Sequence, residues 1–198
     1  MKIRIWEISL AAGVLLAMAF GAWAETAQEN LSGKLVRLHV TANSDGERDQ
    51  ELKLRVRDRI LEAAEPLLKD TRSAAEAAGI LAASLPYLEE QARREAEAAG
   101  YYLPVYAELT REQFPTRRYG GFELPSGSYK ALRVTIGDGA GSNWWCVVFP
   151  PLCGAANAAQ TARAAGFTDG EAALISGNGG VKIKFKCIEI WQRIKNIL

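Results

Sequence analysis

The sequence predicts an α+β fold, in which a mostly antiparallel sheet of about four to five strands carries two to three helices on one face. Three observations lead to this class. Apolar and polar residues alternate with the two-residue period of strands near residue 38 and at several places after residue 101. Residues 47–99 instead show helical spacing and helix caps. An order of one strand, then helices, then mostly strands is typical of α+β domains.

The N-terminal residues 1–24 have the features of a secretory signal peptide. Lys2 and Arg4 precede an apolar stretch over residues 8–21, and Ala22-Trp23-Ala24 matches the small-x-small cleavage pattern, so we expect cleavage after Ala24. The apolar stretch is shorter than the ~20 residues that a membrane-spanning helix needs, which favours a cleaved signal over a retained anchor. We expect residues 25–34, which are polar and without period, to be a flexible tether before a single domain over residues 35–198.

Composition excludes several classes of protein. The chain has 198 residues, 48% of them apolar, with 24 Lys and Arg against 23 Asp and Glu. These values disfavour disordered, collagen-like and strongly nucleic-acid-binding chains. Loss of the signal peptide removes two basic residues and one acidic residue, so the exported chain carries no net charge. No net positive charge therefore attracts the chain to polyanions such as nucleic acids.

The first strand and helix of the domain follow directly from the pattern. Residues 35–40 alternate, with Val36, Leu38 and Val40 on one face, so we expect a strand with that face on the core. Turn and capping residues follow at positions 42–46. A helix is predicted over residues 47–68, with an apolar stripe at helical spacing formed by Leu52, Val56, Ile60 and Ala63.

A second helical region is predicted over residues 73–99. Ser73 and Glu76 are spaced as a capping box at its start, and Gly100 is placed as its C-terminal cap. Pro86 interrupts the region. Because proline is tolerated in the first turn of a helix, two helices that meet near Ser84 and one kinked helix are both consistent with the sequence.

Strand periodicity returns after residue 101. We expect strands around residues 103–109, 132–136, 147–149 and 181–185, and a short helix over residues 169–175. The glycines at positions 137, 139 and 141 lack the following helix and lysine of a phosphate loop, so we interpret them as a tight hairpin-type connection.

The cysteines allow a disulfide or a catalytic thiol. Cys146 and Cys153 form the natural pair of a possible disulfide, and Cys187 is left over; the alternative is that all three are small buried side chains. Cys146 with His39 as base, oriented by Asn43 or Asp45, is the pattern of a thiol hydrolase acting on cell-wall peptide. The chain lacks the paired Cys and His spacings of zinc sites, and we expect no metal and no cofactor.

Two stretches carry side chains suited to binding a partner. Residues 37–57 gather charged and polar residues around one strand-to-helix turn, and Trp144 and Trp145 follow a glycine-rich loop. Adjacent strand residues point to opposite faces, so one of the two tryptophans should face outward. An exposed tryptophan in a polar rim is a common binding anchor. The alternative is that both tryptophans pack in the core and the charged residues cap the first helix.

At these stretches the sequence resembles the stage II sporulation protein R family. The matching runs occupy most of the exported chain in the same order: V36-RLHVTANS-D45, D49-QELKLRVR-D58, Y119-GGFELPSGS-Y129, N143-WWCVVFPPL-C153 and V181-KIKF-K186. The resemblance implies a signalling protein of endospore-forming bacteria, made in the forespore and exported into the space between the two cells. It further implies that the protein activates the membrane-embedded aspartic protease of the mother cell that processes pro-sigma-E, and is not itself an enzyme.

On this interpretation a set of residues forms or braces the surface that contacts the protease. The candidates are Arg37, His39, Asn43, Asp45, Tyr119, Gly120, Gly121, Trp144 and Trp145. The thiol hydrolase is the rival hypothesis, and a purely structural module of the cell envelope is a third.

Overall fold

The computed structural model of this chain describes residues 4–119, 122–153, 158–164 and 166–169, and within them it contains five helices and six strands. The helices are α1 (Ile5–Ser32), α2 (Glu47–Leu68), α3 (Ala74–Ala83), α4 (Leu85–Ala98) and α5 (Ala158–Ala164). The strands are β1 (Val36–Thr41), β2 (Val105–Phe114), β3 (Arg117–Tyr119), β4 (Phe122–Leu124), β5 (Gly127–Ile136) and β6 (Asn143–Phe149). The order of elements confirms the predicted α+β class.

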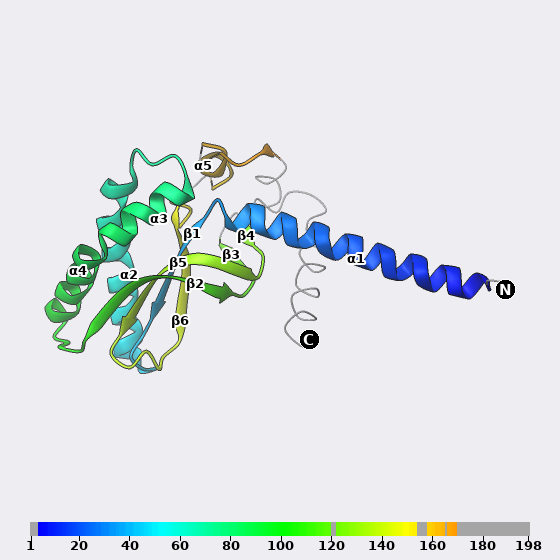
Figure 1. Cartoon of the computed structure of the whole chain (residues 1–198). Coiled ribbons are helices and arrows are strands. Elements are labelled where there is room, and N and C mark those ends of the chain that lie inside the picture. Colours follow the sequence, from blue (N-terminus) through cyan, green and yellow to red (C-terminus); the bar gives the residue numbers. More distant parts are fainter. Residues whose placement is uncertain (1–3, 120–121, 154–157, 165, 170–198) are drawn as a thin grey trace.

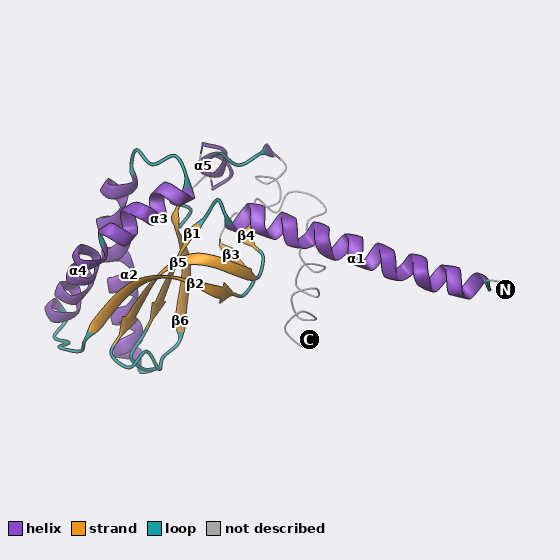
Figure 2. Cartoon of the chain, in the orientation of Figure 1, coloured by secondary structure: helices purple, strands orange, loops and turns teal. Residues whose placement is uncertain are grey.

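The main sheet has four strands in the order β2-β5-β1-β6, as Figure 2 shows. β2 pairs with β5 and β6 pairs with β1 in antiparallel fashion, whereas β1 and β5 run parallel, so the sheet is mixed. Strands β3 and β4 form a separate two-stranded sheet. The first strand of the domain therefore lies inside the sheet, with neighbours that come from the second half of the chain.

Helices α2, α3 and α4 cover one face of this sheet (Figure 1). Val36, Leu38 and Val40 of β1 pack in one buried cluster with the predicted stripe of α2, which is confirmed. Burial of each large apolar side chain contributes about 1.5–3 kcal/mol relative to an exposed position. The second helical region is two helices, α3 and α4, that meet at Ser84, and the Ser73 hydroxyl caps α3 by accepting a hydrogen bond from the Glu76 amide.

A second, smaller core lies on the opposite face of the sheet. Leu31 from the end of α1 and Leu124 from β4 are buried there against the sheet residues Phe114, Tyr129 and Val147. Because both faces are covered at this point, all six residues of β1 are buried. The expectation that only one face of this strand meets a core is wrong, since the alternating pattern cannot distinguish a solvated polar residue from a buried one.

The expected tether over residues 25–34 is also wrong. Helix α1 continues to Ser32, and its last turns pack on the domain. Gln28 donates a hydrogen bond to the Ser128 carbonyl oxygen at 3.4 Å, and Leu31 enters the smaller core. Only a narrow stripe of this segment is buried, so its sequence is mostly polar. The rest of α1 projects away from the domain (Figure 1), and within the described residues it is the one helix long and apolar enough to cross a membrane. Its length therefore does not favour a cleaved signal over a retained anchor, contrary to the argument from the short apolar stretch.

The glycine-rich connection after β5 is not a hairpin. Strand β1 lies between β5 and β6, so residues 137–142 cross over the end of β1. Backbone amides of Ala140 and Gly141 donate to the carbonyl oxygens of Asn43 and Ala42, at 3.1 and 2.9 Å. The connection is thereby fastened to the turn that leads from β1 into α2. The strand expected over 181–185, most of the helix expected over 169–175, and Gly120 and Gly121 lie outside the described residues.

Candidate functional site

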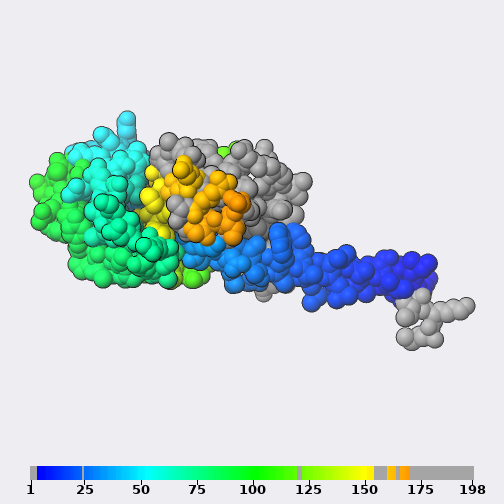
Figure 3. Space-filling view, turned by 90° about the horizontal axis from the view of Figure 1, so that it is seen from above, coloured from blue at the N-terminus to red at the C-terminus, as the bar shows by residue number. Residues whose placement is uncertain are grey.

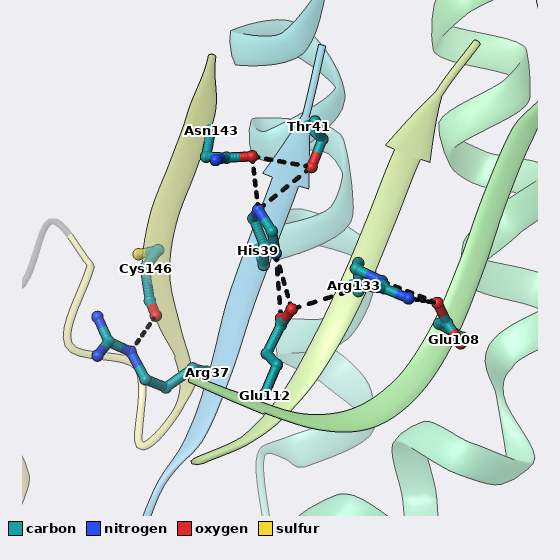
Figure 4. Close-up of polar contacts among 8 residues, drawn as sticks. All are labelled: Arg37, His39, Thr41, Glu108, Glu112, Arg133, Asn143 and Cys146. Atoms are coloured by element: carbon teal, nitrogen blue, oxygen red, sulfur yellow. Dashed lines mark hydrogen bonds and ion pairs between the residues drawn. The ribbon is translucent and has the colours of Figure 1, made fainter. Parts of the chain in front are cut away.

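The candidate site is a polar network on the sheet face opposite helices α2–α4, centred on His39 (Figure 4). The two-residue period of β1 places Arg37, His39 and Thr41 on this face, and strand pairing sets Trp145 beside His39. Figure 4 shows labelled residues of β1, β2, β5 and β6 in front, with the helices behind the sheet. The network therefore combines residues that are about 70 to 100 positions apart in the chain.

Both ring nitrogens of His39 have oxygen partners. Its Nδ1 lies 3.0 Å from a carboxylate oxygen of Glu112, and its Nε2 lies 2.9 Å from Oδ1 of Asn143. The Thr41 hydroxyl lies 3.2 Å from the same Nε2 and donates to Asn143 Oδ1. Trp145 stacks on the imidazole with the ring centroids 3.9 Å apart. His39 is only 7% exposed, so it holds this part of the sheet together rather than offering a free side chain.

The accessible edge of the network is formed by strands β2 and β5. Glu112 is also 3.8 Å from the Arg133 guanidinium, which forms a second, closer ion pair with Glu108. Arg133 is half-buried, Glu108 is exposed, and Tyr106 beside them on β2 is 59% exposed. A partner that approached this face would meet a tyrosine, charged side chains and the half-buried Trp145, as binding surfaces often present.

Arg37 lies deeper on the same face, and it is fully buried. Its guanidinium is 4.1 Å from the ring centroid of Phe114 and 5.0 Å from that of Tyr129, and it donates hydrogen bonds to the Tyr119 hydroxyl and to the Cys146 carbonyl oxygen. Nη1 has no hydrogen-bond acceptor among the described residues. Burial lowers the pKa of Arg37 and raises that of Tyr119. Arg37 therefore braces the β3–β4 sheet from inside and is not a contact residue.

Asn43 and Asp45 hold two loops together at the end of the sheet. Asn43 donates to Asp49 at 2.9 Å and accepts from the Asp138 amide at 3.1 Å, while one Asp45 oxygen accepts from the amide and the hydroxyl of Ser142. These hydrogen bonds lower the pKa of Asp45, and those from Ser44 and Asn43 lower the pKa of Asp49. Both candidates thus have a structural role in the turn over β1.

The two tryptophans point to opposite faces, as predicted. Trp145 lies on the His39 face, whereas Trp144 pairs with Val40 on the side of the helices. Trp144 is 37% exposed, and the Arg57 guanidinium of α2 lies 4.4 Å from its ring centroid. The candidate residues therefore do not form one continuous surface: Trp145 and Trp144 are accessible from different sides of the sheet.

The geometry contradicts a Cys146–His39 catalytic pair. Cys146 pairs with Leu38 and is buried on the helix side of the sheet, while the neighbouring His39 points to the other side. The structure joins Cys146 to Cys153 in a disulfide with the Cα atoms 6.1 Å apart, a separation that a disulfide allows. A thiol hydrolase that uses these two residues is therefore wrong. Among the described residues, no group of three or more His, Cys, Asp and Glu side chains is placed to hold a metal ion.

Sequence reasoning missed Glu112 and Arg133. Each lies on a strand with ordinary alternation, and only the pairing of β2, β5 and β1 brings them to His39. Asn143 had a weak signal, because it precedes the two tryptophans in a run already marked as unusual.

Comparison with known proteins assigns the chain to a family. The model of the family described as Stage II sporulation protein R (spore_II_R) matches residues 32–159. The chain belongs to the stage II sporulation protein R family. It is 35% identical to Stage II sporulation protein R of Bacillus subtilis (strain 168) over 157 residues, which cover 76% of this chain and 69% of that protein. No solved structure matches it. The matched region spans β1 to β6, and so includes the His39 network, the loops tied by Asn43 and Asp45, and both bonded cysteines.

Proposed function

We propose that this stage II sporulation protein R is an exported signal from the forespore to the mother cell, and that it activates the membrane-embedded aspartic protease that processes pro-sigma-E. Membership of the family is the observation that carries the proposal. In this role the chain is a protein ligand, and the catalysis belongs to its partner. Its place of action is the space between the two cell membranes.

The N-terminal helix supports export. Lys2 and Arg4 precede the apolar part of α1, whose large apolar side chains are exposed. Such a segment is compatible with a signal peptide. Cleavage after Ala24 would remove the exposed apolar turns and leave Gln28 and Leu31, the residues that pack on the domain.

The contact surface for the protease is proposed to include Trp145 together with Tyr106 and Arg133 on the open part of the sheet. These side chains are exposed or half-buried, belong to three different strands and lie on the same face of the sheet as the buried His39. Arg37, Asn43 and Asp45 support this surface from below and from its end. Aromatic and arginine side chains contribute strongly to binding in many protein interfaces.

Replacement of the relative's gene in a spore-forming cell tests the proposal. A strain that lacks its own stage II sporulation protein R should again process pro-sigma-E when this chain is supplied with its leader. The same chain without residues 1–24 should stay in the forespore and fail. Loss of processing in Tyr106→Ala and Arg133→Ala, with normal export, would support the site. Normal processing in both variants would refute the site and leave the function standing.

A further inference from the structure

A groove that the proposed contact surface does not use lies between helix α2 and the end of strand β6. Its volume is about 980 Å³, and its walls come from the second half of α2, from Val147–Phe149 and from the turn that follows at Pro150, Pro151 and Cys153. Figure 3 shows this part of the surface, where residues near 150 lie between the helical region and α5. The volume is in the range of sites that take a ligand or a short peptide segment.

The floor and the rim of the groove differ in chemistry. Leu68, Val148 and Phe149 are buried and apolar, and they lie under the groove. Asp58, Glu62 and Glu65 of α2 form one side, and all three side chains are exposed. Residues at this helical spacing lie along one face, over about 10 Å of the helix axis. An apolar floor therefore adjoins a row of carboxylates.

The carboxylates are only partly neutralised. Asp58 forms a 2.7 Å ion pair with Arg57, whereas Glu62 has a single contact of 3.6 Å with Arg59. Glu65 forms no ion pair within the part of the chain that the structure describes. Among the described residues that line the groove, Lys69 is the one basic side chain. The groove therefore favours a group that is both apolar and positively charged.

The wall opposite α2 is already ordered. The Cys146–Cys153 disulfide ties the turn to β6, and the Val147 amide donates to the Cys153 sulfur at 3.2 Å. A wall fixed in this way lowers the ordering cost of binding. The Val147 amide already donates its hydrogen bond to Cys153, so a partner cannot pair with β6 as an added strand at this point. The partner would bind through the partner's own side chains.

We propose that this groove binds a short extended segment of a partner protein in which basic and aliphatic residues alternate. Side chains two residues apart in an extended chain are about 6.7 Å apart, close to the rise of about 6 Å between Asp58 and Glu62. Two lysine or arginine side chains reach the carboxylates of α2, and the aliphatic residue between them covers Val148 and Phe149. The site is separate from the His39 face, so the proposal does not rest on the activation of the protease.

Fluorescence anisotropy tests this proposal with a labelled eight-residue peptide of alternating valine and lysine. The full-length chain is used, held in nanodiscs of zwitterionic phosphatidylcholine. We expect saturable binding, no binding of the matching valine and glutamate peptide, and affinity roughly tenfold weaker in the double variant Glu62→Lys, Glu65→Lys. Glu51→Lys is the matched control, because Glu51 is exposed on the same helix but does not line the groove.

Equal affinity in the groove and control variants, or equal binding of the glutamate peptide, would overturn the proposal. The chain carries an alternating basic segment of its own at residues 181–186, which lies outside the described residues. If Lys182→Glu and Lys184→Glu together tighten peptide binding, that segment competes for the groove and the partner assignment is wrong. If the peptide dissociates a dimer of this chain, the occupant of the groove is a second copy of the chain, and the assignment to a partner protein is equally wrong.

Discussion

A matched pair of glycine substitutions tests the way in which the β5–β6 connection is fastened over β1. At Gly141 a methyl group would lie 2.3 Å from the Ser44 carbonyl oxygen and 3.0 Å from the Ala42 Cβ. The Ser44 carbonyl is a backbone group, and the Ala42 Cβ is attached directly to the backbone. The segment that carries both is joined to this loop by hydrogen bonds at Ala42 and Asn43, so neither atom can move aside cheaply. Gly141→Ala should therefore lower the free energy of unfolding by about 1–3 kcal/mol.

Gly79→Ala is the control variant, for which we expect the free energy of unfolding to rise and not to fall. Gly79 is exposed on α3, and no atom lies within 4 Å of an added Cβ. Alanine in the interior of a helix is more favourable than glycine by about 1 kcal/mol. Each kcal/mol moves the Tm of a domain of this size by about 2–4 °C, so we expect a fall of roughly 2–12 °C for Gly141→Ala and a rise of about 2–4 °C for Gly79→Ala.

Thermal unfolding followed by far-ultraviolet circular dichroism, with both variants and the parent in one buffer, measures these shifts. A Gly141→Ala variant that melts at or above the parent would refute the close packing of the loop on Ser44. A Gly79→Ala variant that melts lower would show that the helix propensity argument does not apply on this face of α3.

Three further predictions concern the disulfide, the loss of stability at acid pH and the His39 network. Cys153→Ala removes the disulfide, which closes a loop with a sequence separation of 7. The free energy of unfolding measured in urea should therefore fall by about 2–3 kcal/mol. Unchanged stability in the absence of reductant would argue against the disulfide. The pKa of Asp49 is lowered in the folded state, so its carboxylate should raise the free energy of unfolding relative to Asp49→Asn. This difference should be full above about pH 4 and should vanish as the pH falls through the lowered pKa. A difference in guanidinium unfolding that does not depend on pH would contradict this. His39→Ala removes the partner of Glu112 and the ring stacked on Trp145, at a cost of about 1–3 kcal/mol in urea unfolding, and Glu112→Ala should add little once His39 is gone; independent, additive losses would show that the two residues do not act together.

Local features of the fold could be predicted closely from the sequence. The bounds predicted for α2, residues 47–68, are those observed, because turn residues precede an apolar stripe of clear helical period. The division between α3 and α4 at Ser84 is one of the two arrangements that Pro86 left open, and the structure decides between them. Trp144 and Trp145 face opposite sides because alternation is a property of the strand itself.

Features that depend on distant pairing could not be predicted. The position of β1 between β5 and β6 turns an apparent hairpin into a crossing loop, and no local pattern reports strand order. The same insertion buries Arg37 and His39, which on their own resemble solvent-facing residues of an alternating strand. Glu112 and Arg133 join the site only through the pairing of β2 with β5.

One immunoblot tests directly whether this chain activates the protease that processes pro-sigma-E, as we propose. Cells outside sporulation would produce the membrane protease and pro-sigma-E without this chain, with residues 1–198, or with residues 25–198. We expect the shorter, processed sigma factor only where residues 1–198 are produced and the chain is exported. Pro-sigma-E that stays uncleaved beside a folded, exported chain would contradict the proposed activation of the protease.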